Sequence, residues 1–232
     1  MNLTLIMAQG HATRWGNGTF KHLAAFNGVP MLTRVCQQVQ ERDTDGIVIG
    51  WAEYEGHTAG LGLMSMAKPG RDVCFGILDT AHLWQGYDRV IILLGDVVYS
   101  QATIDLIYSD TGSLRFYGRI EPGRVTGKTV DERYGFWFRP GVVGDYIKKC
   151  VKEVIADEAC VPALKSLYQH LIGAPRHYPH PAKPMVYWDD IVLTEVNDYT
   201  DDFDHYEEYL EARAAVEAAI RAEEESKEPM SQ

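Results

Sequence analysis

The first two dozen residues constrain the fold of this chain more than any other stretch. Residues 3–8 form a short apolar run that then breaks into glycines, small residues and an arginine. An apolar run of this length bounded by glycine is typical of a buried strand in a parallel sheet. The loop after such a strand lies at the carboxyl end of the sheet, where open α/β sheets bind ligands. The sequence therefore predicts an α/β fold with a ligand site near its N-terminal loop.

This loop carries groups that bind phosphate. Gly10, Gly16 and Gly18 let the backbone approach a ligand closely and turn its N–H groups toward an anion. Arg14 offers a planar fork to phosphate oxygens, and Lys21 offers a point charge. Together they indicate a triphosphate site. A glycine-rich connection with a solvated Arg and Lys stays open as the alternative, because single short motifs often match by chance.

Two better-known phosphate loops do not fit. The dinucleotide fingerprint G-x-G-x-x-G is absent, because Ala12 and Trp15 stand where its second and third glycines belong. A P-loop would have to end at residues 127–129, Gly-Lys-Thr, but Pro122 occupies the position of its first glycine and Gly123 comes one residue too late. We interpret residues 127–129 as unrelated to phosphate binding.

Composition narrows the class of protein. The chain has 232 residues, 46% hydrophobic and 24% charged, which is typical of a globular protein with one large domain or two small ones. Its net charge of −11 argues against non-specific binding to nucleic acid or to an anionic membrane. The four cysteines show no C-x-x-C spacing, so we expect free thiols in a reducing compartment. With no signal peptide or membrane span visible, we expect a cytoplasmic protein.

The pattern along the chain predicts one domain, residues 1–222, followed by a charged, frayed tail at 223–232. Residues 52–73, 121–133 and 175–190 read as irregular loops on the side where a second substrate would bind. Besides the first strand, periodicity predicts strands at 46–51, 89–96, 113–120, 134–139 and 191–196, and helices at 31–42, 79–84, 100–108, 142–157, 161–172 and 203–224.

Acidic residues end two of these strands. The strongest strand, residues 89–94, runs into Gly95 and Asp96, and a carboxylate at a strand end beside a phosphate loop is a natural Mg²⁺ ligand. The alternative for Asp96 is an N-cap of the next helix. The last strand runs into an acidic segment, residues 197–204, with more acidic and amide groups than a helix cap needs. We expect Asp198 to complete a cation site with Asp96.

Histidines form another candidate metal group. His170, His177 and His180 lie close in sequence, but histidines separated by prolines in a loop are more often solvated. We therefore discount this group.

In this order the motifs resemble the nucleotidyltransferases of the nucleotide-diphospho-sugar transferase (GT-A-like) superfamily. That superfamily includes sugar-1-phosphate nucleotidylyltransferases, bacterial-type phosphocholine cytidylyltransferases and molybdenum-cofactor guanylyltransferases. Its opening motif, of the form Leu-Ala-Ala/Gly-Gly-x-Gly-Thr/Ser-Arg-Met/Leu-Gly, corresponds to MAQGHATRWG at residues 7–16. Its Pro-Lys-x-Leu, Gly-x-Pro-Met/Leu, Gly-Asp strand end and late acidic strand end correspond to residues 20–23, 28–31, 95–96 and 195–198.

Three positions depart from the family pattern. Gln9 replaces a small residue, Ala12 replaces the second glycine, and Phe20 replaces the proline. Because Ala adopts a positive φ less readily than Gly, the loop at Ala12 is either not left-handed or reshaped. These departures leave room for an unusual acceptor.

The resemblance implies a single three-layer α/β/α domain with a mostly parallel, Rossmann-like mixed sheet. It implies an Mg²⁺-dependent enzyme that transfers NMP from an NTP to a phosphorylated small molecule, such as a sugar-1-phosphate, and releases pyrophosphate; Mn²⁺ could replace Mg²⁺. Arg14 and Lys21 would be catalytic. The nucleotide would be held by Ala8, Gln9, Gly10, Thr13, Gly76, Thr80 and Gly95, and the metal by Asp96, Asp198 and Asn197.

Two other functions stay open. A GT-A-type glycosyltransferase shares such a sheet and holds metal through Asp-x-Asp, which residues 202–204 match, although near the C-terminus. A nucleotide-binding module without catalysis is the other. The acceptor, the NTP and the oligomeric state, a homodimer included, are not encoded in a readable motif.

Overall fold

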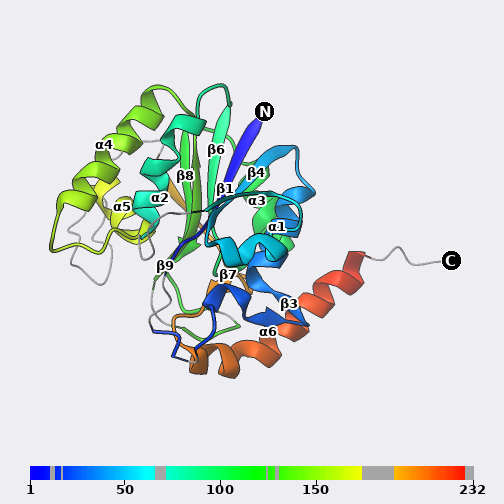
Figure 1. Cartoon of the computed structure of the whole chain (residues 1–232). Coiled ribbons are helices and arrows are strands. Elements are labelled where there is room, and N and C mark those ends of the chain that lie inside the picture. The colour runs from blue at the N-terminus through cyan, green and yellow to red at the C-terminus, as the bar shows by residue number, and fades with distance from the viewer. Residues whose placement is uncertain are drawn as a thin grey trace.

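A seven-stranded sheet with helices on both faces forms the body of the molecule (Figure 1). The computed structural model describes residues 1–10, 14–16, 18–65, 72–123, 125–128, 131–173 and 191–227. The strand order is β10-β8-β9-β6-β1-β4-β5, and β9 alone runs antiparallel to its neighbours. The strands are β1 (Asn2–Ala8), β4 (Thr44–Gly50), β5 (Gly62–Ser65), β6 (Arg89–Leu94), β8 (Leu114–Arg119), β9 (Glu132–Phe138) and β10 (Ile191–Glu195). The predicted three-layer α/β/α fold with a mostly parallel mixed sheet is confirmed.

Helices cover the two faces of the sheet because its central strands are apolar on both sides. The buried strands β1 and β6 send Leu3, Leu5 and Ile92 into one core and Ile6, Ile91 and Leu93 into the other. The first core is covered by α2 (Val73–Asp79), α4 (Val142–Ala156) and α5 (Leu164–Leu171), and the second by α1 (Met31–Gln40) and α3 (Gln101–Ser109). No helix in the described part of the chain has the length and apolar composition needed to cross a bilayer.

A third core ties the N-terminal loop to the C-terminal end of the chain. The long helix α6 (Tyr206–Lys227) runs along the bottom of the molecule in Figure 1. Its Tyr209 and Val216 pack with Trp15 and Phe26 in this core. Trp15 is 1% exposed and lies edge-on to Tyr206 at 5.4 Å between ring centroids. The first loop is therefore held beside the start of α6. Short elements complete the chain: η1 (Lys21–Leu23), β2 (Ala25–Phe26), β3 (Val29–Pro30), η2 (Ala52–His57), η3 (Ala81–Leu83), β7 (Val97–Val98) and β11 (Asp201–Asp202).

One edge of the sheet collects most of the polar strand ends. Strands β1, β6, β8 and β10 all end there, and the antiparallel β9 begins there with Glu132. Beyond β6, the pair Val97–Val98 joins Asp201–Asp202 in a two-stranded antiparallel ladder. This ladder brings the end of a central strand next to the segment that leads into α6.

Three predicted elements were wrong in detail. A helix was expected to begin near Asp79, but α2 ends there. Residues 52–73, expected to be irregular, include the 3₁₀ helix η2 and strand β5, which pairs in parallel with β4. The last helix begins at Tyr206 rather than Phe203, because Phe203 is fully buried in the third core, and it continues to Lys227.

Candidate active site

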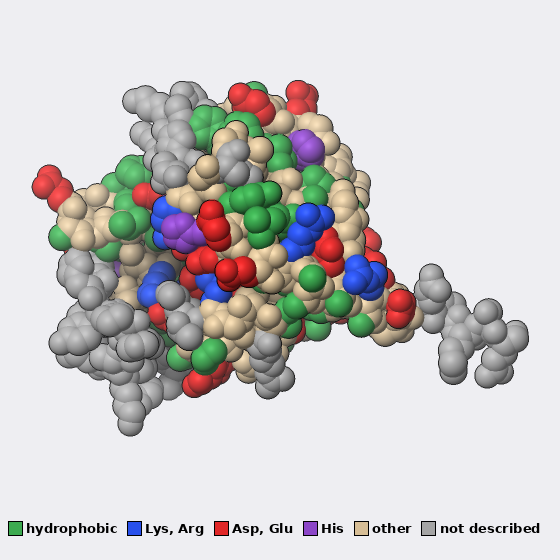
Figure 2. Space-filling model, turned by 90° about the horizontal axis from the view of Figure 1, so that it is seen from below, with side chains coloured by type: hydrophobic (Ala, Val, Ile, Leu, Met, Phe, Trp, Pro, Cys, Tyr) green, Lys and Arg blue, Asp and Glu red, His purple; other side chains and the backbone are tan. Residues whose placement is uncertain are grey.

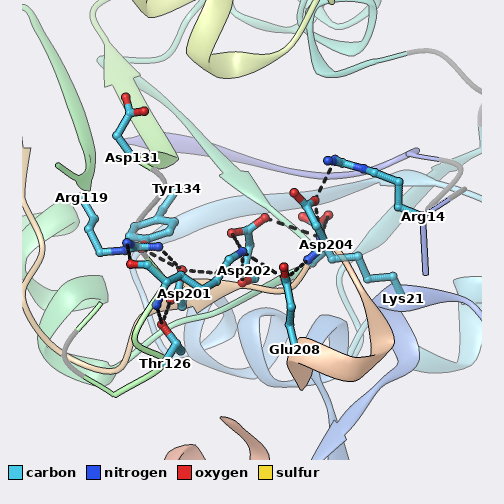
Figure 3. Close-up of polar contacts among 12 residues, drawn as sticks. Arg14, Lys21, Arg119, Thr126, Asp131, Tyr134, Asp201, Asp202, Asp204 and Glu208 are labelled. Atoms are coloured by element: carbon cyan, nitrogen blue, oxygen red, sulfur yellow. Dashed lines mark hydrogen bonds and ion pairs between the residues drawn. The ribbon is translucent and has the colours of Figure 1, made fainter. Parts of the chain in front are cut away.

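Lys21 lies at the centre of a charged cluster (Figure 3). It is the first residue of η1, and only 5% of its side chain is exposed. Its Nζ lies 2.9 Å from Asp96 Oδ2, 3.6 Å from Asp202 Oδ2 and 3.8 Å from Asp204 Oδ1. One amine thus joins the end of the first loop, the end of β6 and the segment before α6.

The charges in this cluster shift each other's pKa. Burial alone would lower the pKa of Lys21, but the three carboxylates outweigh it and raise that pKa above its ordinary value. Burial alone would raise the pKa of Asp96, yet the charge on Lys21 lowers it to about 2. Both groups are therefore charged at neutral pH.

Two more cations and two more carboxyl groups border Lys21. Arg14 Nη2 lies 2.8 Å from Asp204 Oδ1, and Lys128 Nζ lies 3.3 Å from Asp202 Oδ1 and 3.4 Å from Glu208 Oε2. Figure 2 shows acidic and basic side chains gathered on the face of the molecule that is seen from below. With Glu132, which lies beside Asp202 and Asp204, the cluster has five carboxyl groups and three cations. The cluster therefore has more carboxyl groups than positively charged groups.

This excess fits a divalent cation. Carboxylate oxygens of Glu132, Asp202 and Asp204 lie within 4.8 Å of one another, and oxygen atoms are the ligands that Mg²⁺ and Mn²⁺ prefer. Burial, followed by the charge of Asp202, raises the pKa of Glu132 to about 8. Lys128 opposes this rise in pKa without cancelling it, so the oxygen donors of Glu132, Asp202 and Asp204 fit the divalent metal that the resemblance implies.

A cavity of about 160 Å³ opens beside the charged cluster. Asp96 belongs to both the cavity and the cluster, which places a ligand in the cavity next to Lys21. The wall is largely apolar, with a few polar groups: Gln9, Gly10, His22, Asp72 and Asp96. Such a mixture is typical of sites that bind small molecules.

His22 contributes an uncharged polar group to this wall. It is 2% exposed, and its Nδ1 lies 2.9 Å from the hydroxyl of Tyr54 in η2. Burial lowers the pKa of His22 to about 4, so its imidazole is neutral at physiological pH. The hydrogen bond to Tyr54 fixes the ring, and the neutral imidazole adds no charge to the site.

Asp198, the expected partner of Asp96, lies at the start of helix α3. Its carboxylate accepts hydrogen bonds from the hydroxyls of Ser100 and Thr103 and, at 2.7 Å, from the backbone N–H of Thr200. Ser100 in turn caps α3 by accepting from the N–H of Thr103. The structure brings Asp202 and Asp204, not Asp198, to Lys21. Asn197 is exposed.

The residues expected to hold the nucleotide fall into two groups. Gln9 and Gly10 line the cavity, and Gln9 Nε2 donates to the carbonyl oxygen of Asp72 at 2.8 Å. Thr80 is fully buried, and its hydroxyl donates to the carbonyls of Gly76 and Ile77 at the end of α2. Thr80 therefore closes a helix and does not line the cavity.

Three small residues on that list allow close packing. A Cβ on Gly76 would lie 2.3 Å from Gln9 Oε1, and a Cβ on Gly95 would lie 2.9 Å from the Cβ of Ala8. Glycine at both positions lets the first loop, β6 and α2 approach closely. Ala8 is fully buried between them. Thr13 and Ala12 lie outside the described residues.

Of the three histidines considered as a candidate metal group, only His170 lies among the described residues. His170 pairs with Glu153 at 2.7 Å between Nε2 and Oε2. His177 and His180 lie outside the described residues.

Five groups in the cluster were not among the predicted site residues: Lys128, Glu132, Asp202, Asp204 and Glu208. Asp202 and Asp204 were visible in the acidic segment and as an Asp-x-Asp match, but their place near the C-terminus counted against them and Asp198 was preferred. Lys128 was set aside because its surroundings do not match a P-loop, although a lysine can reach a site from any loop. Glu132 is marked only by its place as the first residue of the antiparallel strand.

Comparison with known proteins was informative at the level of structure. No protein-family profile and no curated protein sequence matches the chain. A putative glucose-1-phosphate thymidylyltransferase from Bacillus anthracis, solved in complex with sucrose, matches with a TM-score of 0.60 and 14% identity, over 95% of this chain and 96% of that one. The chain therefore shares the overall fold of this solved structure.

Two further structures agree with this fold. A homologue of Mycobacterium tuberculosis rv0371c from Mycobacterium sp. strain JC1 matches with a TM-score of 0.59 and 16% identity, over 95% of this chain and 98% of that one. HddC from Yersinia pseudotuberculosis matches with a TM-score of 0.53 and 12% identity, over 92% of this chain and 99% of that one. The shared fold therefore extends over nearly the whole chain, and the activity has to be argued from the site.

Proposed function

We propose that this protein is a nucleotidyltransferase that transfers NMP from an NTP to a phosphorylated small molecule and releases pyrophosphate. The observation that carries the proposal is the convergence of Lys21, Asp96, Asp202 and Asp204 beside a cavity of small-molecule size. Buried lysines among carboxylates suit a ligand that brings both phosphate groups and a divalent cation.

A divalent cation would be held by Asp202, Asp204 and Glu132, with Asp96 across Lys21 from them. When bound, it would neutralise phosphate charge and restore the ionised form of Glu132. We prefer Asp202 to Asp198 as the partner of Asp96, because the carboxylate oxygens of Asp198 accept hydrogen bonds at α3.

The residues of the chain would supply position and charge. An oxygen of the acceptor phosphate attacks the α-phosphorus, the bond from that phosphorus to the oxygen bridging to the β-phosphate breaks, and pyrophosphate leaves with the electron pair. Lys21 and Lys128 would bind the oxygens around the reacting phosphorus, and Arg14 would bind the leaving group. No covalent intermediate is needed, since orientation and charge neutralisation lower the barrier. The nucleotide would bind in the cavity that is lined by Gln9, Gly10 and His22.

The first experiment is a thermal-shift panel of the four NTPs with Mg²⁺, followed by a pyrophosphate-release assay with sugar-1-phosphates and related phosphorylated acceptors. A ligand at about a hundred times its Kd stabilises the native state by about 2.7 kcal/mol, which raises the melting temperature measurably. We expect one NTP to stabilise the protein and to yield pyrophosphate. Binding without turnover across the acceptor panel would favour a nucleotide-binding module instead.

A GT-A-type glycosyltransferase is the second candidate. Asp202 and Asp204 form an Asp-x-Asp pair, and both carboxylates lie within 4 Å of Lys21, so the pair belongs to the cluster despite its late position in the chain. Release of a nucleoside diphosphate from a nucleotide sugar, with no pyrophosphate from any NTP, would establish this alternative.

A further inference from the structure

A buried ion pair lies beside the acidic cluster (Figure 3). Arg119, at the end of β8, places Nη2 3.0 Å from Asp201 Oδ1, and the two side chains are 3% and 2% exposed. The hydroxyl of Tyr134 accepts from Arg119 Nε at 2.9 Å and donates to the same Asp201 oxygen at 3.1 Å. The hydroxyl of Thr126 donates to the other oxygen of Asp201. Both charges are thus fully hydrogen-bonded out of water.

This network joins the segments that carry the cluster. Asp201 precedes Asp202, and β11 places Asp202 opposite Val97, the residue after Asp96. Arg119 Nη1 donates to the carbonyl oxygen of Lys128 at 2.6 Å, which fixes the backbone of the residue whose Nζ reaches Asp202. Tyr134 lies two residues after Glu132 on β9. One guanidinium therefore ties together β8, β9, β11 and the loop before β9.

Stability is a weak reason for such a pair. Removing two charges from water costs more than a well-packed apolar pair of the same size, and buried ion pairs are often neutral or unfavourable for folding. The adjacent acidic cluster, however, requires its side chains to be held at a fixed spacing, and the Arg119–Asp201 pair holds the segments that carry them. Carboxylate oxygens of Asp202, Asp204 and Glu132 lie within 4.8 Å of one another, a spacing that like charges oppose unless the surrounding structure holds it.

We propose that the Arg119–Asp201 pair is a positioning device, which holds Asp202 and Lys128 in place and thereby sets the affinity of the acidic cluster for a divalent cation. The proposal rests on the proposed function for the presence of that cation. Groups that orient metal ligands from behind typically change metal affinity by about 10- to 100-fold when they are substituted. Arg119→Lys keeps the charge but loses the fork that reaches Asp201, Tyr134 and Lys128 together.

The test compares Arg119→Lys with a matched control, Arg89→Lys. Arg89 likewise donates several hydrogen bonds, three in all, to the carbonyls of Ile107, Tyr108 and Asp110 at the end of α3, and none of these residues belongs to the cluster. Mn²⁺ alone is titrated into each full-length protein by calorimetry and by loss of the free Mn²⁺ EPR signal, and the melting temperature is measured without metal. Both variants should melt earlier than wild type.

We expect Arg119→Lys to weaken Mn²⁺ binding about tenfold or more, and Arg89→Lys to change it less than about twofold. If Arg119→Lys does not fold, Tyr134→Phe removes one hydroxyl from the network, and Tyr117→Phe is its control, since the Tyr117 hydroxyl donates to Asp110 at 2.7 Å. Tyr134→Phe should weaken Mn²⁺ about threefold or more, with no change in Tyr117→Phe.

The outcomes separate the two proposals. Wild-type Mn²⁺ affinity in Arg119→Lys and Tyr134→Phe would overturn the positioning role while leaving the cation site in place. Equal losses in the Arg119 and Arg89 variants would also overturn it, because general loosening would then explain both. No Mn²⁺ binding by the wild type would overturn the cation site, and the positioning role with it.

Discussion

The contact between Lys21 and Asp96 yields a stability prediction that can be worked from the structure. Lys21→Met keeps the aliphatic stem and removes the charge, and Asp96→Asn removes the opposite charge. Lowering the pKa of Asp96 from 3.8 to about 2 corresponds to about 2 kcal/mol, at about 1.4 kcal/mol for each tenfold change in proton affinity. Because burial opposes this lowering, a double-mutant cycle should give a coupling free energy of at least about 2 kcal/mol at pH 7.

The sign of the pH dependence follows from the direction of the shift. Because the pKa of Asp96 is lower in the folded state, its contribution is complete above pH 4 to 5 and is lost as the pH falls through about 2. The coupling should fall to about half at pH 3. Urea unfolding followed by tryptophan fluorescence measures it. A coupling below about 0.5 kcal/mol at pH 7, as in exposed pairs, or the same coupling at pH 3, would refute the reasoning.

Three further predictions test separate parts of the account. Lys128→Met should lower turnover about 100- to 1000-fold, as loss of one electrostatic group in an active site does, with an unchanged circular dichroism spectrum; Lys148→Met, on the surface of α4, should leave turnover unchanged. Asp198→Ala should destabilise the protein by about 1–3 kcal/mol in urea unfolding, because three donors at α3 lose their acceptor, yet leave the Mn²⁺ affinity as in wild type. Because the folded pKa of His22 is about 4, its ring should show no titration between pH 8 and 5.5 in an NMR spectrum assigned with His22→Asn. The free energy of unfolding should fall as the pH drops from about 6.5 toward 4. An NMR midpoint near 6.5 would contradict the burial of this ring.

Most of the sheet could be predicted because its strands are uninterrupted apolar runs. Residues 3–8 and 89–94 must be buried on both faces, and only a central position in a covered sheet achieves this. Helix α2 was misplaced because Gly76 interrupts its pattern, and the reason for that glycine is the amide of Gln9 packed against it from another segment. Strand β5 has four residues and depends on pairing with β4, so it carries little signal of its own.

The site was predictable where a side chain is fixed by the strand before it. Asp96 follows β6 within two residues, and Lys21 follows the first loop, so their meeting could be expected from the order of elements. Which of the acidic residues in 197–204 would reach Lys21 could not be predicted from the sequence. It depends on the pairing of β11 with β7, which turns Asp202 toward Lys21, whereas Asp198 lies at the start of α3. Lys128 depends in the same way on a loop held by Arg119.

The most direct test of the central claim, that distant acids and Lys21 meet around one cation and its phosphate ligand, is an anomalous difference map from a crystal soaked in Mn²⁺. The account predicts a peak bound by carboxylate oxygens of Asp202, Asp204 and Glu132, with the Lys21 amine and Asp96 beside it. A peak at Asp198, or carboxylates of Asp96 and Asp202 facing different surfaces, would contradict it.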